Sequence, residues 1–134
     1  MCSTVYGFAV GGYNPYNAET ELLSINDWTW SSRAQYPFHN DIFWHATLTH
    51  NDVFIVFGGY SYNNGGRQST IAQYNPNDDT WTKLGDLNKA RYTHDVITSE
   101  DALLIVGDGP TEKCTLTGNT VNCVNQEPNG LRYG

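Results

Sequence analysis

The nine residues DVFIVFGGY, positions 52 to 60, decide how this chain folds. An unbroken apolar run, 53 to 57, leads directly into the glycine pair Gly58-Gly59. Such a run, bounded by turn-forming residues, is typical of a β-strand that is buried on both faces. The stretch therefore predicts a central strand with packing layers on either side of it.

The same pattern occurs twice more, as VYGFAVGGY at 5 to 13 and DALLIVGDG at 101 to 109. Two other landmarks, a Thr-Trp pair and a histidine, recur at a similar period of about 50 residues. The repeated residues are Gly11 and Gly12, Gly58 and Gly59, Gly107, Trp30 and Trp81, and His45 and His94. Because three unrelated landmarks agree, the chain is predicted to be built from repeats.

Each repeat is predicted to contain four short strands. In the second repeat these are expected at 44–51, 52–60, 69–76 and 79–85, with turn residues NPNDD between the last two. Four antiparallel strands in roughly 50 residues have the size of one blade of a β-propeller. This favours an all-β fold made of stacked blades.

Composition agrees with an all-β chain and excludes some partners. The chain of 134 residues has 13 glycines, 4 tryptophans and 9 tyrosines, which favour strands and turns over helices. Its net charge of −7 disfavours nucleic acid, whose phosphates it would repel. No apolar run approaches the length that a bilayer requires, so we expect no membrane insertion.

The second repeat resembles the kelch repeat. The resemblance is carried by the glycine pair Gly58-Gly59, Tyr74 in the third strand, Trp81 in the fourth, and Arg91 and His94 leading into the next blade. It implies a β-propeller of four-stranded antiparallel blades. Repeated residues of this kind, including His45 and His94, are expected to serve the architecture.

The flanking repeats are more divergent. Alignment places Ile25 and Leu116 where the second repeat has Tyr74, Ile42 where it has Arg91, and Asp108 where it has the second glycine. We expect about three blades, approximately 1–41, 42–90 and 91–131, with 132–134 entering a further blade. Propellers typically need four to eight blades. The chain is thus expected to be part of a longer kelch protein, or to form a ring completed by another chain.

Two of the three cysteines lie in the last repeat, in KCTLTGNTVNCV at 113 to 124. Gly118-Asn119 suits a two-residue hairpin, and that register sets Cys114 opposite Cys123. Opposite residues in a non-hydrogen-bonded pair come close enough for a disulfide. Free thiols and a metal site are the alternatives, although a metal needs more ligands. Cys2 is expected to be a small buried residue.

The loops after the glycine pairs are the candidate binding surface. They combine tyrosines, asparagines and an arginine, types that interfaces favour, although ordinary solvated turns could have this composition too. The candidate residues are Tyr13, Asn14 and Tyr16 in the first loop, and Tyr60, Tyr62, Asn63, Asn64 and Arg67 in the second.

The sequence offers no catalytic triad, phosphate loop or metal motif, so we expect no enzyme activity, no cofactor and no metal. It predicts a non-enzymatic module that binds a protein partner. The disulfide favours an extracellular or secreted location. The alternatives are a structural subunit that self-associates through open propeller edges, and the propeller part of an intracellular, cytoplasmic kelch adaptor.

Overall fold

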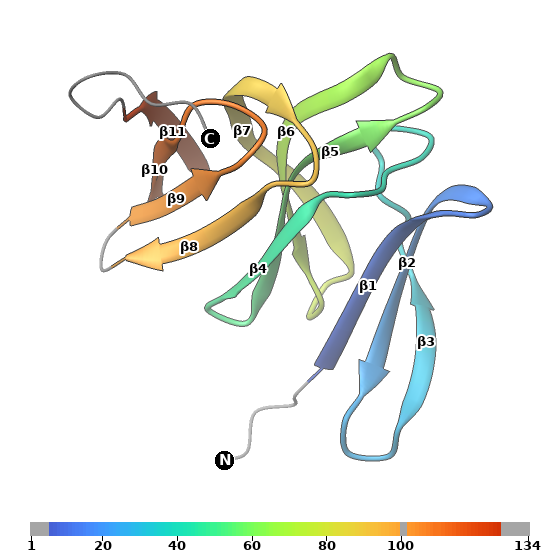
Figure 1. Cartoon of the computed structure of the whole chain (residues 1–134). Coiled ribbons are helices and arrows are strands. Elements are labelled where there is room, and N and C mark those ends of the chain that lie inside the picture. Colours follow the sequence, from blue (N-terminus) through green and yellow to red (C-terminus); the bar gives the residue numbers. More distant parts are fainter. Residues whose placement is uncertain (1–5, 100–101, 127–134) are drawn as a thin grey trace.

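The computed structural model describes residues 6–99 and 102–126, and every regular element within these ranges is a β-strand (Figure 1). Cys2 and the segment 132–134 lie outside the described residues. The strands are β1 (Tyr6–Tyr13), β2 (Tyr16–Ser24), β3 (Thr29–Arg33), β4 (Ala46–His50), β5 (Val53–Ser61), β6 (Gly66–Asn75), β7 (Thr80–Arg91), β8 (Asp95–Ser99), β9 (Ala102–Val106), β10 (Glu112–Thr117) and β11 (Thr120–Asn125). The part of the chain described holds no helix with the length and hydropathy of a membrane span.

The strands form three antiparallel sheets, each a blade-like meander of consecutive strands. The first blade contains β1 to β3, the second β4 to β7, and the third β8 to β11. The four strands expected in the second repeat are all present, although β6 begins earlier and β7 ends later than the sequence indicated. In Figure 1 the second blade lies between the first and third. The chain therefore has the fold of a partial β-propeller.

The apolar run in β5 lies at the centre of the packing, as expected. Ile55 and Phe57 belong to a core shared with the third blade, whereas Val56 packs with residues of the first blade. Phe54 joins a smaller cluster with Leu22 of the first blade. Because adjacent residues of a strand point to opposite faces, only a strand covered on both sides favours such an unbroken apolar run.

The repeated glycines mark a bulge in the second strand of a blade. Gly11 and Gly58 have φ of +72° and +60°, and the pairing register shifts at each of them. A Cβ at Gly58 would lie 2.8 Å from the carbonyl oxygen of Arg91, and one at Gly11 would lie 1.9 Å from that of Ile42. Glycine is required here because it tolerates positive φ and leaves room for a crossing backbone.

Strand pairing corrects two positions of the sequence alignment. In the second blade Phe54, Tyr74 and Trp81 lie opposite one another across three strands. The corresponding rows are Gly7, Leu23 and Trp30 in the first blade and Leu103, Cys114 and Cys123 in the third. Leu23 thus takes the place of Tyr74, not Ile25, and Cys114 takes it in the third blade, not Leu116. The sequence alignment placed these residues wrongly because the connections between strands differ in length from blade to blade.

This row faces the preceding blade. Trp81 packs against Phe8 of the first blade at 6.1 Å between ring centroids and against Tyr36 at 5.1 Å, and its Nε1 donates a hydrogen bond of 2.9 Å to the carbonyl of Ala34. Trp81 therefore packs between the second blade and the first. Trp30 does not: it is 55% exposed, because no blade among the described residues covers that side of the first blade.

Arg91 connects the second blade to the third. Its fully buried guanidinium forms a salt bridge with the fully buried carboxylate of Glu112, and it donates hydrogen bonds to the carbonyls of Gly107 and Pro110. Glu112 in turn accepts the backbone N–H groups of Asn88 and Lys89. A buried ion pair is tolerated only when its remaining donors and acceptors are satisfied, as they are here. Glu112 was not anticipated from the sequence.

Candidate functional site: an aromatic surface at one end of the blades

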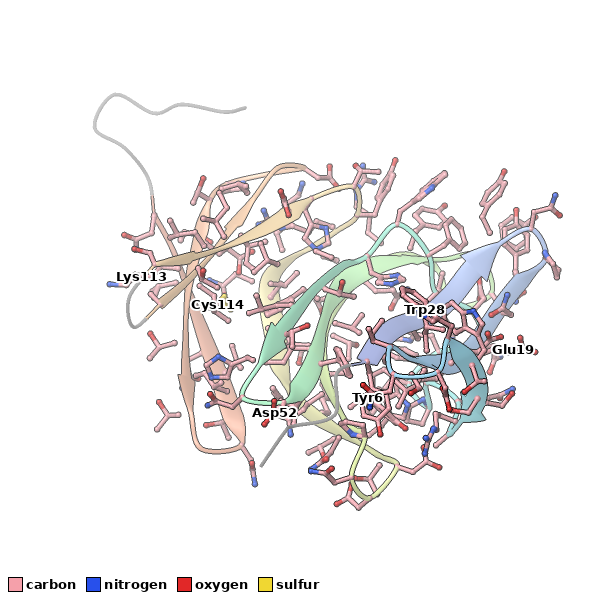
Figure 2. All side chains as sticks on the ribbon, turned by 90° about the horizontal axis from the view of Figure 1, so that it is seen from below. Tyr6, Glu19, Trp28, Asp52, Lys113 and Cys114 are labelled. Atoms are coloured by element: carbon pink, nitrogen blue, oxygen red, sulfur yellow. A yellow bond between two sulfur atoms is a disulfide. The ribbon has the colours of Figure 1, made fainter. Side chains whose placement is uncertain are left out.

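The alternating strand directions bring several loops to one end of the molecule. The ends of β1 and β5 and the starts of β2 and β6 lie there, together with the connections that precede β4 and β8 (Figure 1). The opposite end, which faces the viewer in Figure 2, carries the turns that contain Trp28 and Asp52. Loops far apart in the sequence can therefore build one surface.

Aromatic side chains from these loops gather into one cluster, which we call the aromatic face. It consists of Tyr13, Tyr16, Phe43, Trp44, Tyr60, Tyr62, Tyr92 and Arg67. Four of the rings remain accessible to solvent: Tyr62 at 66%, Tyr13 at 53%, Trp44 at 49% and Tyr16 at 41%. Exposed aromatic patches of this kind on soluble proteins mark interaction sites.

One set of rings forms a stack at the side of the first blade. Tyr62 lies on Tyr16 with centroids 5.1 Å apart and planes 6° from parallel. Tyr16 stacks in turn on Phe43 at 5.4 Å and 21°. Phe43 is buried and its backbone pairs with Tyr60, so the bottom of this stack is fixed to the second blade.

A second stack runs toward the third blade. Tyr13 stacks on Trp44 at 5.4 Å, and Trp44 stacks on Tyr92 at 5.6 Å. The guanidinium of Arg67 lies over the ring of Tyr92, 4.9 Å from its centroid, which is a cation–π contact. Tyr13 also meets Tyr16 edge-on at 5.3 Å, so the two stacks are continuous.

Asp41 holds the loop that carries Tyr62. Its fully buried carboxylate accepts hydrogen bonds from the Ser61 hydroxyl at 2.8 Å, the Tyr62 N–H at 2.7 Å and the Asn63 N–H at 3.1 Å. Desolvation would raise the pKa of Asp41, but these hydrogen bonds outweigh it and lower the pKa below its ordinary value. The carboxylate of Asp41 therefore fixes the loop that carries Tyr62, a role that no sequence pattern indicated.

Asp108 plays a similar part on the other side of the aromatic face. It accepts the Tyr92 N–H at 3.0 Å and the Arg67 Nε at 3.1 Å, and Lys89 lies 3.9 Å away. Desolvation opposes the charged form of Asp108, yet the Tyr92 hydrogen bond and Arg67 lower its pKa. Asp108 replaces a glycine of the repeat and gains a side chain that positions Tyr92 and Arg67.

The predicted loop residues are thus brought together, with unequal roles. Asn14 and Asn63 are exposed beside the rings, whereas Asn64 accepts the N–H of Asn40 at 2.9 Å and helps to brace its loop. Sequence reasoning missed Phe43, Trp44 and Tyr92. These residues lie in the connections between blades. The signal that could have drawn attention to them is that the aromatic residues Phe43 and Tyr92 share the 49-residue spacing of the histidines.

The repeated histidines lie beneath the surface, near the glycine bulges. His94 Nε2 donates a hydrogen bond of 2.8 Å to the carbonyl of Phe57, and a Cβ at Gly59 would lie 3.0 Å from the Cβ of His45. Burial lowers the pKa of both imidazoles, to about 4 for His45, where the charge of His94 contributes as well. Both side chains are therefore neutral at physiological pH.

The predicted disulfide is present at the far side of the molecule, where Figure 2 labels Cys114. Cys114 pairs with Cys123 across β10 and β11, with Cα atoms 4.0 Å apart. Gly118 has φ of +61°, as the predicted turn requires. Glu112 lies close to both sulfurs, and these three residues are the one group of potential metal ligands within the described ranges. Both sulfurs are bonded to each other in the disulfide, and the Glu112 carboxylate is paired with Arg91, so none of the three groups is available as a metal ligand.

Comparisons with known proteins agree with this architecture. Residues 45–88, most of the second blade, match the model of the kelch motif. A curated relative, Kelch repeat and BTB domain-containing protein 1 of cowpox virus (strain Brighton Red), is 28% identical over 116 residues. That match covers 84% of this chain and 20% of the relative, so the chain spans about a fifth of the relative's length. The solved structure of YjhT superimposes with a TM-score of 0.58 and 19% identity, covering 69% of this chain and 28% of that one.

The three meandering sheets with their glycine bulges define a protein of the β-propeller class, present here as a partial set of blades. Within that class the chain is similar to kelch-repeat proteins, because residues 45–88 match the kelch motif and the viral relative carries kelch repeats. Kelch repeats generally serve in protein–protein interaction. The aromatic face, at the end of the blades where loops are free to vary, is the surface on which such an interaction can be sought.

Proposed function

We propose that this chain is a non-enzymatic interaction module that binds a protein partner through the aromatic face. The observation that carries the proposal is the continuous pair of aromatic stacks, built from the first two blades and the connections between blades, and half exposed to solvent. Tyr, Trp and Arg are the residue types that dominate binding energy at protein interfaces. Here they are concentrated in one place.

Preorganisation supports the proposal. Asp41 and Asp108 fix the Tyr62 loop and the Tyr92–Arg67 pair by hydrogen bonds, so the rings are already positioned before any partner arrives. A surface that is already ordered loses little conformational entropy on binding, and this increases affinity. Solvated turns of no function would not need the buried carboxylate of Asp41 and the half-buried one of Asp108 to hold them.

Selection from a random peptide library displayed on phage tests the proposal. Peptides enriched on the native chain are expected to lose binding to a Tyr16→Ala/Tyr62→Ala variant. They should keep binding to a Trp28→Ala variant, which removes an exposed ring at the opposite end. Enriched peptides that bind the double variant as well as the native chain would show that the aromatic face is not the binding surface.

The disulfide supports an extracellular location as part of this proposal, because such bonds persist in oxidising compartments. Mass spectrometry of the protein from its natural source, with and without reductant, tests this. A mass increase of two hydrogen atoms on reduction is expected. Free thiols at Cys114 and Cys123 in the natural material would favour an intracellular kelch adaptor instead.

A second candidate function is assembly through the open blades. The side of the first blade that carries Trp30 is uncovered, and on the third blade Ile97 and Val124 are 48% and 58% exposed. Strand pairing puts the row Ile97, Leu104, Lys113 and Val124 on the face opposite to the Cys114 row, away from the second blade. Two blade faces with exposed apolar side chains beside polar ones are thus available to join chains head to tail. Sedimentation velocity tests this, since two chains of 15.0 kDa would move as one compact particle of about 30 kDa.

A further inference from the structure

The Tyr62 ring has one face available for a ligand. Its other face stacks on Tyr16 at 5.1 Å, and among the described aromatic rings Tyr16 is its only stacking partner. The side chain is nevertheless 66% exposed, the highest value in the aromatic face. An ordered ring with a free face offers its negative quadrupole to whatever docks on it.

A negative charge without a salt-bridge partner anchors the loop that carries Tyr62. Asp41 is fully buried and forms no salt bridge with Lys, Arg or His among the residues that the structure describes. His39 is near enough for Asp41 to act on it, but burial outweighs that attraction and lowers the His39 pKa, which leaves the imidazole uncharged at neutral pH. Its hydrogen bonds come from uncharged donors, Ser61 and two backbone N–H groups. These stabilise the ionised carboxylate, so Asp41 keeps its charge at neutral pH. Asp41 also acts on the nearby Tyr16, whose pKa is raised by desolvation first, and then by Tyr13, Tyr62 and Asp41.

The opposite end of the aromatic face shows the same combination with a cation in place. There the Arg67 guanidinium lies 4.9 Å from the centroid of the Tyr92 ring, and its Nε is hydrogen-bonded to Asp108 at 3.1 Å. A tyrosine ring and a carboxylate thus already hold a guanidinium on this surface. At the Tyr62 end, the ring and the carboxylate are present without a cation.

We propose that the Tyr62–Tyr16 ring pair, next to the loop that Asp41 anchors, binds the guanidinium of an arginine side chain presented by the protein partner. The proposal rests on the interaction function proposed above and specifies the chemistry of the partner. Charge complementarity favours it, since the chain carries −7 overall and would attract a basic segment and repel an acidic one. Arginine is favoured over lysine because its planar, weakly hydrated guanidinium stacks on aromatic rings.

Peptides taken from the library selection test the proposal quantitatively. Those that depend on the aromatic face are expected to contain arginine. Each is synthesised with its arginine and, as a matched probe, with citrulline, a neutral side chain of almost the same shape. Fluorescence polarisation of labelled peptides is expected to show about tenfold weaker binding for the citrulline form, the loss of one partly desolvated cation–π contact.

Three variants separate the site from general effects on folding. Tyr62→Phe keeps the ring and should retain the preference for arginine over citrulline, while Tyr62→Ala should abolish that preference. Trp28→Ala, at the opposite end, should leave it unchanged. Thermal unfolding of each variant checks that the fold is intact.

The outcomes also separate this inference from the function on which it rests. Face-dependent peptides that lack a cation, or that bind equally well with citrulline, would overturn the arginine site and leave the interaction function standing. Selection that yields no face-dependent peptide would contradict both.

Discussion

His45 is a single residue on which pH acts directly, because its imidazole is largely removed from solvent. His45 has its pKa lowered to about 4 by burial and by the neighbouring charge of His94, whereas an unfolded chain would titrate it near the ordinary histidine value. Between those two values the unfolded state binds a proton that the folded state does not. Stability is therefore complete above about pH 6.5 and falls as the pH drops toward 4.

We predict that a His45→Gln variant is less sensitive to acid than the native chain. Removing this group should reduce the loss of unfolding free energy between pH 7 and pH 4 by about 3 kcal/mol at most. Urea unfolding at a series of pH values measures it. A Trp28→Ala variant, which removes an exposed side chain that does not titrate, should keep the native pH dependence. Equal slopes in all three proteins would show that His45 does not titrate as described.

Asp41 and Asp108 show how single residues create a site that motifs do not reveal. Neither belongs to a recognisable motif, and the sequence analysis noted Asp108 only as a departure from the glycine of the repeat. Their importance comes from the N–H groups that the fold directs at them. Such roles depend on backbone positions 16 or more residues away, so they could not be predicted from local sequence.

Among the elements, the last strand of the second and third blades, β7 and β11, provides contact with the preceding blade. Trp81 of β7 packs on Phe8 and Tyr36, while Trp30 of β3 occupies the equivalent row but faces solvent. We predict that Trp81→Ala destabilises the chain by about 3 kcal/mol, since it leaves a cavity between blades. Trp30→Ala should change stability by less than about 0.5 kcal/mol. Urea unfolding at low protein concentration compares the two; similar losses would contradict this assignment.

The β10–β11 hairpin is the element for which local sequence was sufficient. Gly118 at the turn fixes the register, and the register brings Cys114 opposite Cys123. The disulfide stands where the second blade has the pair Tyr74 and Trp81, whose rings lie 5.2 Å apart. In the third blade a covalent bond thus replaces the aromatic packing found at this position in the second blade.

We predict that removing this bond by a Cys114→Ser/Cys123→Ser change lowers the free energy of unfolding by about 2 kcal/mol. The loop that the bond closes is short, so the entropic contribution is modest. Reduction of the native protein should give the same loss, and reductant should have no effect on the double variant. A native chain indifferent to reductant would contradict a stabilising disulfide.

At the scale of the whole molecule, two outer blade faces that carry exposed apolar side chains have no neighbouring blade among the described residues. The first is marked by Trp30 and the second by Ile97 and Val124. Trp30 occupies the position that Trp81 uses to contact the preceding blade, so a similar contact with another blade would bury it. The same geometry that joins the second blade to the first can therefore join further blades.

We predict that the chain associates through these faces and that Trp30→Glu weakens the association at least tenfold, because it places a charge in an apolar contact. Sedimentation equilibrium over a range of concentrations measures it. Trp28→Glu, which alters an exposed ring in a turn, should leave the association unchanged. A native chain that stays monomeric at all concentrations would contradict assembly by this route.

The aromatic face is also a property of the whole molecule, because residues far apart in the sequence build it. Tyr13, Tyr16, Tyr60 and Tyr62 could be proposed from the sequence because they follow the glycine pairs that end a strand. Phe43, Trp44 and Tyr92 were not proposed, because they lie in the connections between blades, whose course over the surface depends on how the blades stack. The two stacks combine rings from positions as far apart as 13 and 92.

The sequence by itself determined the strands, the blade period, the glycine bulges and the cysteine pairing, because all of these depend on apolar patterning and turn chemistry within a few residues. Only the tertiary structure decided that Leu23 and Cys114 take the position of Tyr74 in their blades, and that Trp30 is exposed while Trp81 is covered. It also decided that Asp41, which has no salt-bridge partner among the described residues, anchors the loop of Tyr62. Those features arise from contacts between blades, where burial and charge depend on neighbours distant in the chain. The local pattern therefore specified the blades, and their packing created the candidate binding surface.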